Sequence, residues 1–200
     1  MVNLTVTGGT PTECTAVAMG LFDGLHSGHR TVISRAAEIA ETHSDVSPAV
    51  FTFETSSVTS KGDGGVECIL SREMKLELIE NMGVRYIYSP DFSEFRNLSG
   101  EEFVKQVLTD RLNAKFAVCG EDFRFGKGAE CGVNELDKLC GKYGIELCVV
   151  PKVTEESGKR ISSTMIRELV RNGEIEAANR LLGTPFTLKL PVSHGKKLGR

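Results

Sequence analysis

The sequence has no long apolar run and no marked excess of charge of either sign. No stretch approaches the ~18 apolar residues of a membrane span, and residues 1–5 lack the basic start and apolar stretch of a signal peptide. With 24 Lys and Arg against 27 Asp and Glu, the net charge is −3, which gives no general attraction for nucleic acid or an anionic membrane. We therefore expect a cytoplasmic protein with no nucleic-acid or membrane partner, in which any affinity for phosphate is local.

The six cysteines have neither the spacing of a zinc site nor that of a disulfide framework. None forms C-x-x-C, and none has a histidine at ligand spacing. Cys119 and Cys148 lie in apolar, strand-like runs, where a thiol packs as a small hydrophobe. We expect reduced cysteines without a redox role.

Three common catalytic motifs are missing or incomplete. No G-x-x-x-x-G-K-[ST] occurs, which argues against a P-loop kinase. Residues 126–132 contain one residue too many for G-x-G-x-x-G and do not directly follow a predicted strand, so they are a weak signal for dinucleotide binding. No G-x-S-x-G is present, which leaves covalent acyl transfer without support.

Short apolar runs alternate with helical patterns along the chain. Strands are predicted at residues 15–21, 48–53, 84–88, 115–119 and 145–151, and helices at residues 29–41, 71–82, 99–112 and 134–143. Ser99 and Glu102 have the spacing of a capping box, whereas Ser71 is expected to be a simple serine cap. This alternation predicts an α/β fold, a doubly wound parallel sheet with helices on both faces, and the length suits one main domain.

An apolar run that ends in Asp-Gly and leads to a histidine pair is the most informative feature of the chain. The first turn of a helix presents unpaired N–H groups and about half a positive charge, which suits phosphate. His26 and His29 are three residues apart, so on that turn both imidazoles can donate to phosphate oxygens. A lone histidine would usually be packed or merely exposed, but here three glycines leave space for a ligand: Gly20, Gly24 and Gly28.

Residues 20–29 read G-L-F-D-G-L-H-S-G-H, residues 120–126 read G-E-D-F-R-F-G, and residues 161–167 read I-S-S-T-M-I-R. These three blocks resemble, in order and separation, those of the H-x-G-H nucleotidyltransferases in the form found in the bacterial bifunctional riboflavin kinase and FAD synthetase family. The resemblance covers roughly residues 14–200. Because the first two blocks each follow a predicted strand, we expect them on the same rim of the sheet.

The resemblance implies a Rossmann-like nucleotidyltransferase fold and the transfer of AMP from ATP to FMN, which gives FAD and pyrophosphate. The flavin phosphate would attack the α-phosphorus in line, with no enzyme nucleophile, so catalysis would consist of alignment and charge stabilisation. The implied catalytic residues are His26, His29 and Arg167. The implied ATP-binding residues are Gly20, Phe22, Asp23, Gly24, Gly28, Gly120, Asp122, Ser162, Ser163 and Thr164.

Within the third block, Ser162 is expected to cap a helix, with Ser163 and Thr164 meeting phosphate and Arg167 holding the β- and γ-phosphates. Mg²⁺ is expected to bind mainly through the ATP phosphates, so no dedicated metal cage is predicted. Asp122 is the best protein candidate for contact with the metal shell, and the metal ligands themselves stay unassigned.

The flavin side departs from the family pattern. Where the family commonly carries F-x-P-H-P, this chain reads F-E-T-S-S at residues 53–57. Phe53, Phe123 and Phe125 are the expected FMN contacts, although alternating aromatics such as the last two are also typical of a core.

The expected domains are residues 1–183, an FMN adenylyltransferase domain, and residues 184–200, which resemble the first strand and glycine turn of a riboflavin kinase barrel. Those last residues are too few for a barrel core, so no riboflavin kinase activity is expected from this chain. Residues 154–160 are charged and are predicted to be mobile until nucleotide binds.

Two alternative functions stay open at this point. The first is another H-x-G-H adenylyl- or cytidylyltransferase, such as a pantetheine-phosphate adenylyltransferase, although residues 120–126 and the carboxyl-terminal residues count against it. The second is a nucleotide-binding remnant that holds ATP without transferring AMP, which the departure after Phe53 favours. The oligomeric state is also left open.

Overall fold

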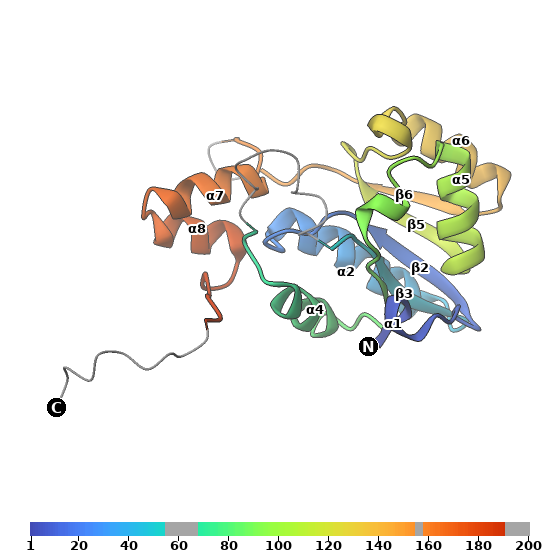
Figure 1. The fold of residues 1–200 in the computed structure, drawn as a ribbon, viewed down its shortest axis with the longest axis horizontal. Coiled ribbons are helices and arrows are strands. Elements are labelled where there is room, and N and C mark those ends of the chain that lie inside the picture. Colours follow the sequence, from blue (N-terminus) through green and yellow to red (C-terminus); the bar gives the residue numbers. More distant parts are fainter. Residues whose placement is uncertain (55–67, 155–157, 191–200) are drawn as a thin grey trace.

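The computed structural model describes residues 1–54, 68–154 and 158–190, and its centre is a six-stranded parallel sheet (Figure 1). The strand order is β1-β4-β3-β2-β5-β6, and every pairing is parallel. The strands are β1 (Val2–Asn3), β2 (Cys14–Met19), β3 (Val46–Phe51), β4 (Tyr86–Tyr88), β5 (Ala114–Gly120) and β6 (Glu146–Val150). The predicted parallel α/β fold is confirmed, and β1 is an edge strand that the sequence did not predict.

The direction in which the sheet grows reverses between β2 and β5, which lie side by side at its centre. From β2 the chain builds outward to β3 and β4, and from β5 it builds the other way to β6. Loops that follow two such neighbouring strands diverge and leave a crevice at the carboxyl ends, where open α/β sheets bind their ligands. Both motif-bearing loops leave the sheet at this point.

Helices cover both faces of the sheet, and the last two in the chain pack against each other to one side of it (Figure 1). They are α1 (Leu4–Thr7), α2 (Ser27–Thr42), α4 (Arg72–Glu80), α5 (Gly100–Phe103), η2 (Val104–Arg111), α6 (Val133–Lys142), α7 (Ser163–Arg171) and α8 (Ile175–Leu182), with short 3₁₀ turns η1 (Phe92–Glu94) and η3 (Lys127–Ala129). The capping box of Ser99 and Glu102 and the simple cap of Ser71 are confirmed. After its first turn, the predicted helix at 99–112 continues as the π-helix η2 rather than as an α-helix.

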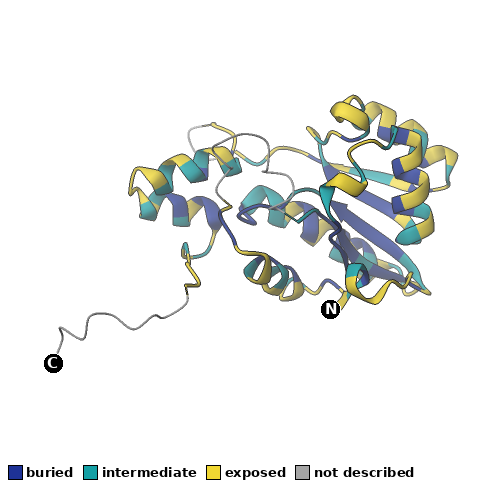
Figure 2. Ribbon diagram, in the orientation of Figure 1, coloured by how far each residue is buried: buried dark blue, intermediate teal, exposed yellow. Residues whose placement is uncertain are grey.

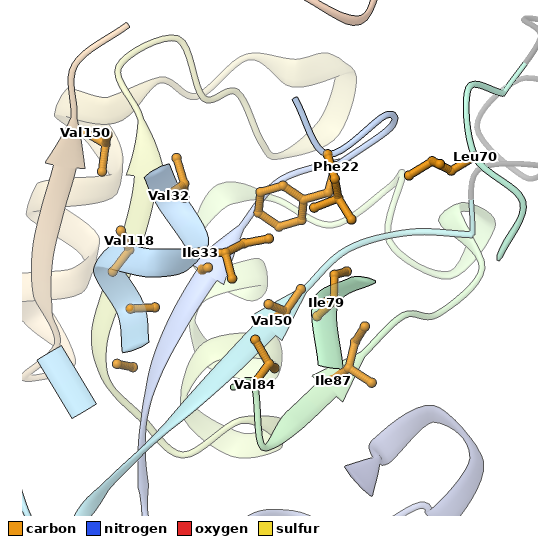
Figure 3. Close-up of a cluster of buried hydrophobic side chains, with 14 of the residues drawn as sticks. Phe22, Val32, Ile33, Val50, Leu70, Ile79, Val84, Ile87, Val118 and Val150 are labelled. Carbon is orange, nitrogen blue, oxygen red and sulfur yellow. The ribbon is translucent and has the colours of Figure 1, made fainter. Parts of the chain in front are cut away.

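Two apolar cores lie on opposite faces of the sheet, because successive strand residues point in opposite directions. In β2, Ala16 and Ala18 face the core beneath α2 and α4, whereas Val17 and Met19 face the core beneath α5, η2 and α6. Figure 2 shows the central strands largely buried and the outer helix faces exposed. Figure 3 shows the first core, in which Phe22 packs with side chains of α2 and the strands.

All six cysteines are free thiols in the structure, as predicted. Among the described residues, no helix is both long and apolar enough to cross a membrane. Residues 184–190 form neither helix nor strand. The predictions for residues 191–200, for the polar span at 55–65 and for part of the segment 154–160 concern residues outside the described ranges.

Candidate active site

A cavity of about 790 Å³ opens at the carboxyl ends of the central strands. Its lining comes from the ends of the central strands and from the segments that follow β2 to β6, and it includes Gly20, Phe53, Gly120 and Val153. This volume lies in the range usual for small-molecule sites. The prediction that the loops at 20–29 and 120–126 share one rim is confirmed.

The loop between β2 and α2 is held in a strained conformation. Phe22 and Leu25 have φ values of 52° and 44°, in the left-handed region that non-glycine residues rarely adopt. Both side chains are buried in the core, at 1% and 0% exposure, and this anchoring offsets the strain. Between them, Gly24 has φ 83°, and a Cβ there would lie 2.9 Å from Ile69 Cδ1. The loop shape is therefore fixed by packing on both sides.

His26 and His29 lie against each other at the start of α2. Their rings are stacked, with centroids 3.6 Å apart and planes 20° apart. His26 is the N-cap of the helix, and its Nδ1 accepts a hydrogen bond from the His29 backbone N–H at 3.4 Å. A Cβ on Gly28 would lie 3.3 Å from the His26 ring, so glycine leaves room for this arrangement. Because Nδ1 is an acceptor, a neutral His26 carries its proton on Nε2 and can donate from there.

Both imidazoles are neutral at pH 7. Burial lowers the pKa of His26 to about 4, and the Arg160 charge adds to this effect against the opposing Asp23 and Asp122 charges. Burial also holds the pKa of His29 well below its usual value, with further lowering by His26, Lys75 and Arg160. His29 Nδ1 is buried, and in the described part of the chain it has no hydrogen-bond partner. The two neutral imidazoles can therefore donate hydrogen bonds to an anion that binds at this helix N-terminus.

Asp23 connects the histidine loop to the third sequence block. Its Oδ2 pairs with Arg167 Nη2 at 2.7 Å, and its backbone carbonyl accepts from Ser163 Oγ at 2.8 Å. Its Oδ1 accepts from the Ile69 backbone N–H at 3.0 Å. Asp23 has a side-chain exposure of 1% and Arg167 of 15%, so this ion pair is largely shielded from water. Helix α7 is thus fastened against the loop that carries the histidines.

Six of the residues that the sequence predicts as catalytic or ATP-binding lie outside the described lining of the cavity. Arg167 and Ser163 bond to Asp23 behind the loop, and Ser162 caps α7 as expected, with its Oγ accepting from the Met165 backbone N–H at 3.3 Å. None of these three, nor Asp23, Gly24 or Thr164, is among the described residues that line the cavity. Their contact with ATP stays a prediction. The cavity does include His26, His29, Gly20, Phe22, Gly28, Gly120 and Asp122.

Basic side chains that the sequence did not single out border the cavity. Arg160 Nη2 is paired with Asp122 Oδ2, which joins the segment before α7 to the loop after β5. The other basic lining residues are Arg96, Arg124, Lys127 and Lys152. Arg160 directly precedes the third block, but its position among other charges at 154–160 predicted only a mobile segment. The pairing with Asp122 comes from the fold, since the two residues are 38 positions apart.

Aromatic side chains form a further part of the cavity lining, the aromatic wall. Phe53, Phe123 and Phe125 line the cavity, as do Phe92 and Phe95 from the segment after β4, which the sequence did not indicate. Phe53 meets Phe92 edge to face, with centroids 5.1 Å apart, and Phe123 stacks on Phe125 at 5.9 Å. Phe125 is 6% exposed and also belongs to the core. This wall offers a planar ligand both stacking and edge contacts.

The described residues contain no group of three or more His, Cys, Asp or Glu side chains that could hold a metal ion. Asp122 is the acidic side chain in the described lining of the cavity. One carboxylate beside several cations suits a magnesium ion that reaches the site on a polyphosphate, since Mg²⁺ keeps water and phosphate oxygens as ligands.

A parallel sheet with imidazoles at a helix N-terminus in its central crevice defines an α/β protein whose site suits a phosphate-bearing ligand such as a nucleotide. Residues 10–165 match the sequence profile of the FAD synthetase family. The chain belongs to this family.

Two relatives, one bifunctional and one an FAD synthetase, support this family assignment. The chain is 39% identical over 188 residues to the bifunctional riboflavin kinase/FMN adenylyltransferase of Bacillus subtilis, an alignment that covers 92% of this chain and 58% of that protein. It is 32% identical over 184 residues to an FAD synthetase of Listeria monocytogenes, covering 92% of this chain and 74% of that protein. The chain therefore spans about three fifths of the bifunctional relative.

Solved structures have the same fold. The crystal structure of a macrolide-efflux protein from Streptococcus pneumoniae is 31% identical, with a TM-score of 0.77 over 89% of this chain and 67% of that chain. A pantothenate synthetase from Thermus thermophilus has a TM-score of 0.52 at 16% identity over 92% of this chain and 81% of that one, which shows the fold alone.

Proposed function

We propose that this chain is an FMN adenylyltransferase, which transfers AMP from ATP to FMN and produces FAD and pyrophosphate. The observation that carries this proposal is the stacked pair of His26 and His29 at the N-terminus of α2, in a cavity that is also lined by an aromatic wall. The first feature suits a phosphate chain and the second suits a flavin ring. Membership of the FAD synthetase family supports the same reaction.

In the proposed reaction, an oxygen of the FMN phosphate attacks the α-phosphorus of ATP. A new phosphorus–oxygen bond forms as the bond to the oxygen that bridges the α- and β-phosphates breaks, and pyrophosphate leaves. Nε2–H of His26, the His29 imidazole and the amides of the first turn of α2 donate to phosphate oxygens. These bonds strengthen as negative charge builds on the equatorial oxygens, so no protein nucleophile is needed.

The cationic border would hold the departing pyrophosphate. Arg160 is available to phosphate if it exchanges Asp122 for a phosphate oxygen, and Lys127 borders the same cavity. An exchange of this kind brings the loop after β5 and the start of the third block to the nucleotide together. Magnesium, bound mainly through the ATP phosphates with Asp122 as its candidate carboxylate, would neutralise charge on the leaving group.

Arg167, Ser163 and Asp23 have a supporting part in this proposal. Their mutual contacts fix the position of α7 on the histidine loop. Because these contacts hold the histidine loop in place, the two imidazoles stay at a constant distance from the reacting phosphates. Such fixed positioning is the main requirement of an in-line transfer.

The direct test is to incubate the 200-residue chain with ATP, magnesium and FMN, and to separate the products by chromatography. We expect FAD and pyrophosphate in equal amounts. Phosphopantetheine offered in place of FMN should not be adenylylated. Transfer to phosphopantetheine alone would favour the other class of adenylyltransferase, and ATP binding without any transfer would favour a nucleotide-binding remnant. We further propose that riboflavin supplied with ATP is not phosphorylated by this chain.

A further inference from the structure

We propose that Lys75 is a positioning residue that fixes the loops after β2 and β3, and through them both the imidazole pair and the aromatic wall. The inference rests on the proposed function, because it assigns Lys75 a part in arranging that site. Lys75 lies on α4, which contributes no residue to the described lining of the cavity.

The contacts of Lys75 reach both loops at once. Its Nζ donates to the Phe53 backbone carbonyl at 2.8 Å, and to the Leu21 carbonyl and Thr52 Oγ1 at 3.4 Å each. Thr52 Oγ1 in turn donates to the same Leu21 carbonyl at 2.9 Å. Leu21 lies in the strained loop that leads to His26, and Phe53 is part of the aromatic wall. One ammonium group therefore joins the backbone of the loop after β2, at Leu21, to the backbone of the loop after β3, at Phe53.

The burial of Lys75 is expensive and is not required by core packing. The residue is 1% exposed, and burying an ammonium group is unfavourable unless its partners compensate. An apolar side chain of similar length would fill the same space without that cost. An apolar side chain, however, cannot donate hydrogen bonds to the Leu21 and Phe53 carbonyl groups, which lie where the two loops begin.

Charges around Lys75 connect it to the histidines. Burial lowers the pKa of Lys75 to about 8, opposed by Asp23 on the histidine loop, by Cys68 before α4 and by Glu54 after β3, while Arg72 on α4 lowers it further. The Lys75 charge is one of the causes that lower the pKa of His29, together with burial, His26 and Arg160. The ammonium group thus acts on the imidazole pair by geometry and by charge.

The test compares Lys75→Met with Ile79→Val, a variant of a fully buried residue one turn further along the same helix. Both changes disturb the packing of α4, but only the first removes the ammonium group. We expect kcat/KM for FAD formation to fall roughly tenfold or more in Lys75→Met, as hydrogen bonds to a charged group are lost. In Ile79→Val the melting temperature falls and kcat/KM is unchanged.

A second readout follows the histidines directly. In Lys75→Met, the His29 imidazole resonance should titrate at a higher pH than in the wild type, because a nearby positive charge is gone. In Ile79→Val, which disturbs the same helix but keeps the ammonium group, this titration should not move. Since the NMR measurement needs no FAD formation, failure of the proposed function and failure of the Lys75 inference are distinguishable.

A folded Lys75→Met protein with unchanged kcat/KM or an unchanged His29 titration overturns the inference. If this variant does not fold, Thr52→Val decides, because it keeps the lysine but removes the hydroxyl that accepts from Lys75 Nζ and donates to the Leu21 carbonyl. A fall in kcat/KM of roughly fivefold is then expected, and an unchanged value overturns the inference. If the wild type forms no FAD, the affinity for ATP replaces kcat/KM in the same comparisons.

Discussion

His29 is the residue whose side chain the proposed reaction uses most directly. Replacing it by Ala removes a donor that strengthens with charge in the transition state, so the turnover number for FAD formation should fall roughly a hundredfold or more. Turnover is measured with saturating ATP and FMN. The matched control is His43→Ala at the other end of the same helix, where Nδ1 lies 2.8 Å from the Ile39 carbonyl, far along α2 from the cavity. Unchanged turnover in His29→Ala would falsify its role as a donor.

Asp23 should matter for stability as well as for the site. Asp23→Asn keeps an oxygen for the Ile69 N–H but leaves Arg167 facing a neutral amide in a place with little water. We expect the free energy of unfolding to fall by roughly 3 kcal/mol, measured by urea denaturation. Glu38→Gln, which breaks the exposed pair with Arg35, should cost less than about 1 kcal/mol. Equal losses in the two variants would mean that the Asp23 pair is no stronger than a surface one.

The position of a single residue could be predicted from the sequence where a local spacing pattern determined it. The spacing of His26 and His29 on one helical turn was enough to predict rings on a common face, and they are stacked. The partner of Arg167 was not predictable, because Asp23 is 144 positions away and only the docking of α7 brings the two together. Nothing in the sequence indicated that Lys75 is buried, since a lysine on an amphipathic helix is ordinarily solvated.

Among the elements, the N-terminus of α2 makes the clearest prediction. Unfolded His26 takes up a proton near pH 6.5, whereas the folded residue stays neutral until about pH 4, so the native state binds fewer protons between these values. Stability is therefore lost as the pH falls through this window. His26→Asn keeps a good N-cap but removes the titration. The loss of unfolding free energy between pH 6.5 and pH 4 should shrink by up to about 3 kcal/mol in this variant.

The comparison is made by chemical denaturation of both proteins at several pH values. The same loss of stability in both proteins over this window would show that His26 is not held neutral by its surroundings. A parallel measurement with an ATP analogue should show tighter binding as the pH falls, because phosphate favours the charged imidazoles.

The bounds of the helices and strands show how accurately local sequence patterns predict each element. The predicted strands at 15–21 and 48–53 end two residues earlier, at Met19 and Phe51, and α2 begins at Ser27 rather than at residue 29 because the His26 side chain caps it. Strand β1 has two residues and α1 has four, too few to show a period. Helix α8 was also not predicted as a separate element.

At the scale of the whole molecule, the alternation of strands and helices predicts a parallel sheet, but not the order of its strands. That order places β2 beside β5, and this neighbourhood brings residues 20–29 and 120–126 to one crevice. The aromatic wall was foreseen only in part. Phe92 and Phe95 come from a turn after β4 and reach the cavity through the fold, without any motif in the sequence.

The account depends most on the claim that both imidazoles hold the phosphate chain of the nucleotide beside the flavin. A crystal structure of the chain with a non-hydrolysable ATP analogue and FMN tests it directly. The predicted result is a phosphate oxygen about 3 Å from His26 Nε2, with the His29 ring on the same phosphate chain and the flavin ring against the phenylalanine wall. A bound nucleotide with both rings turned away from its phosphates would contradict the account.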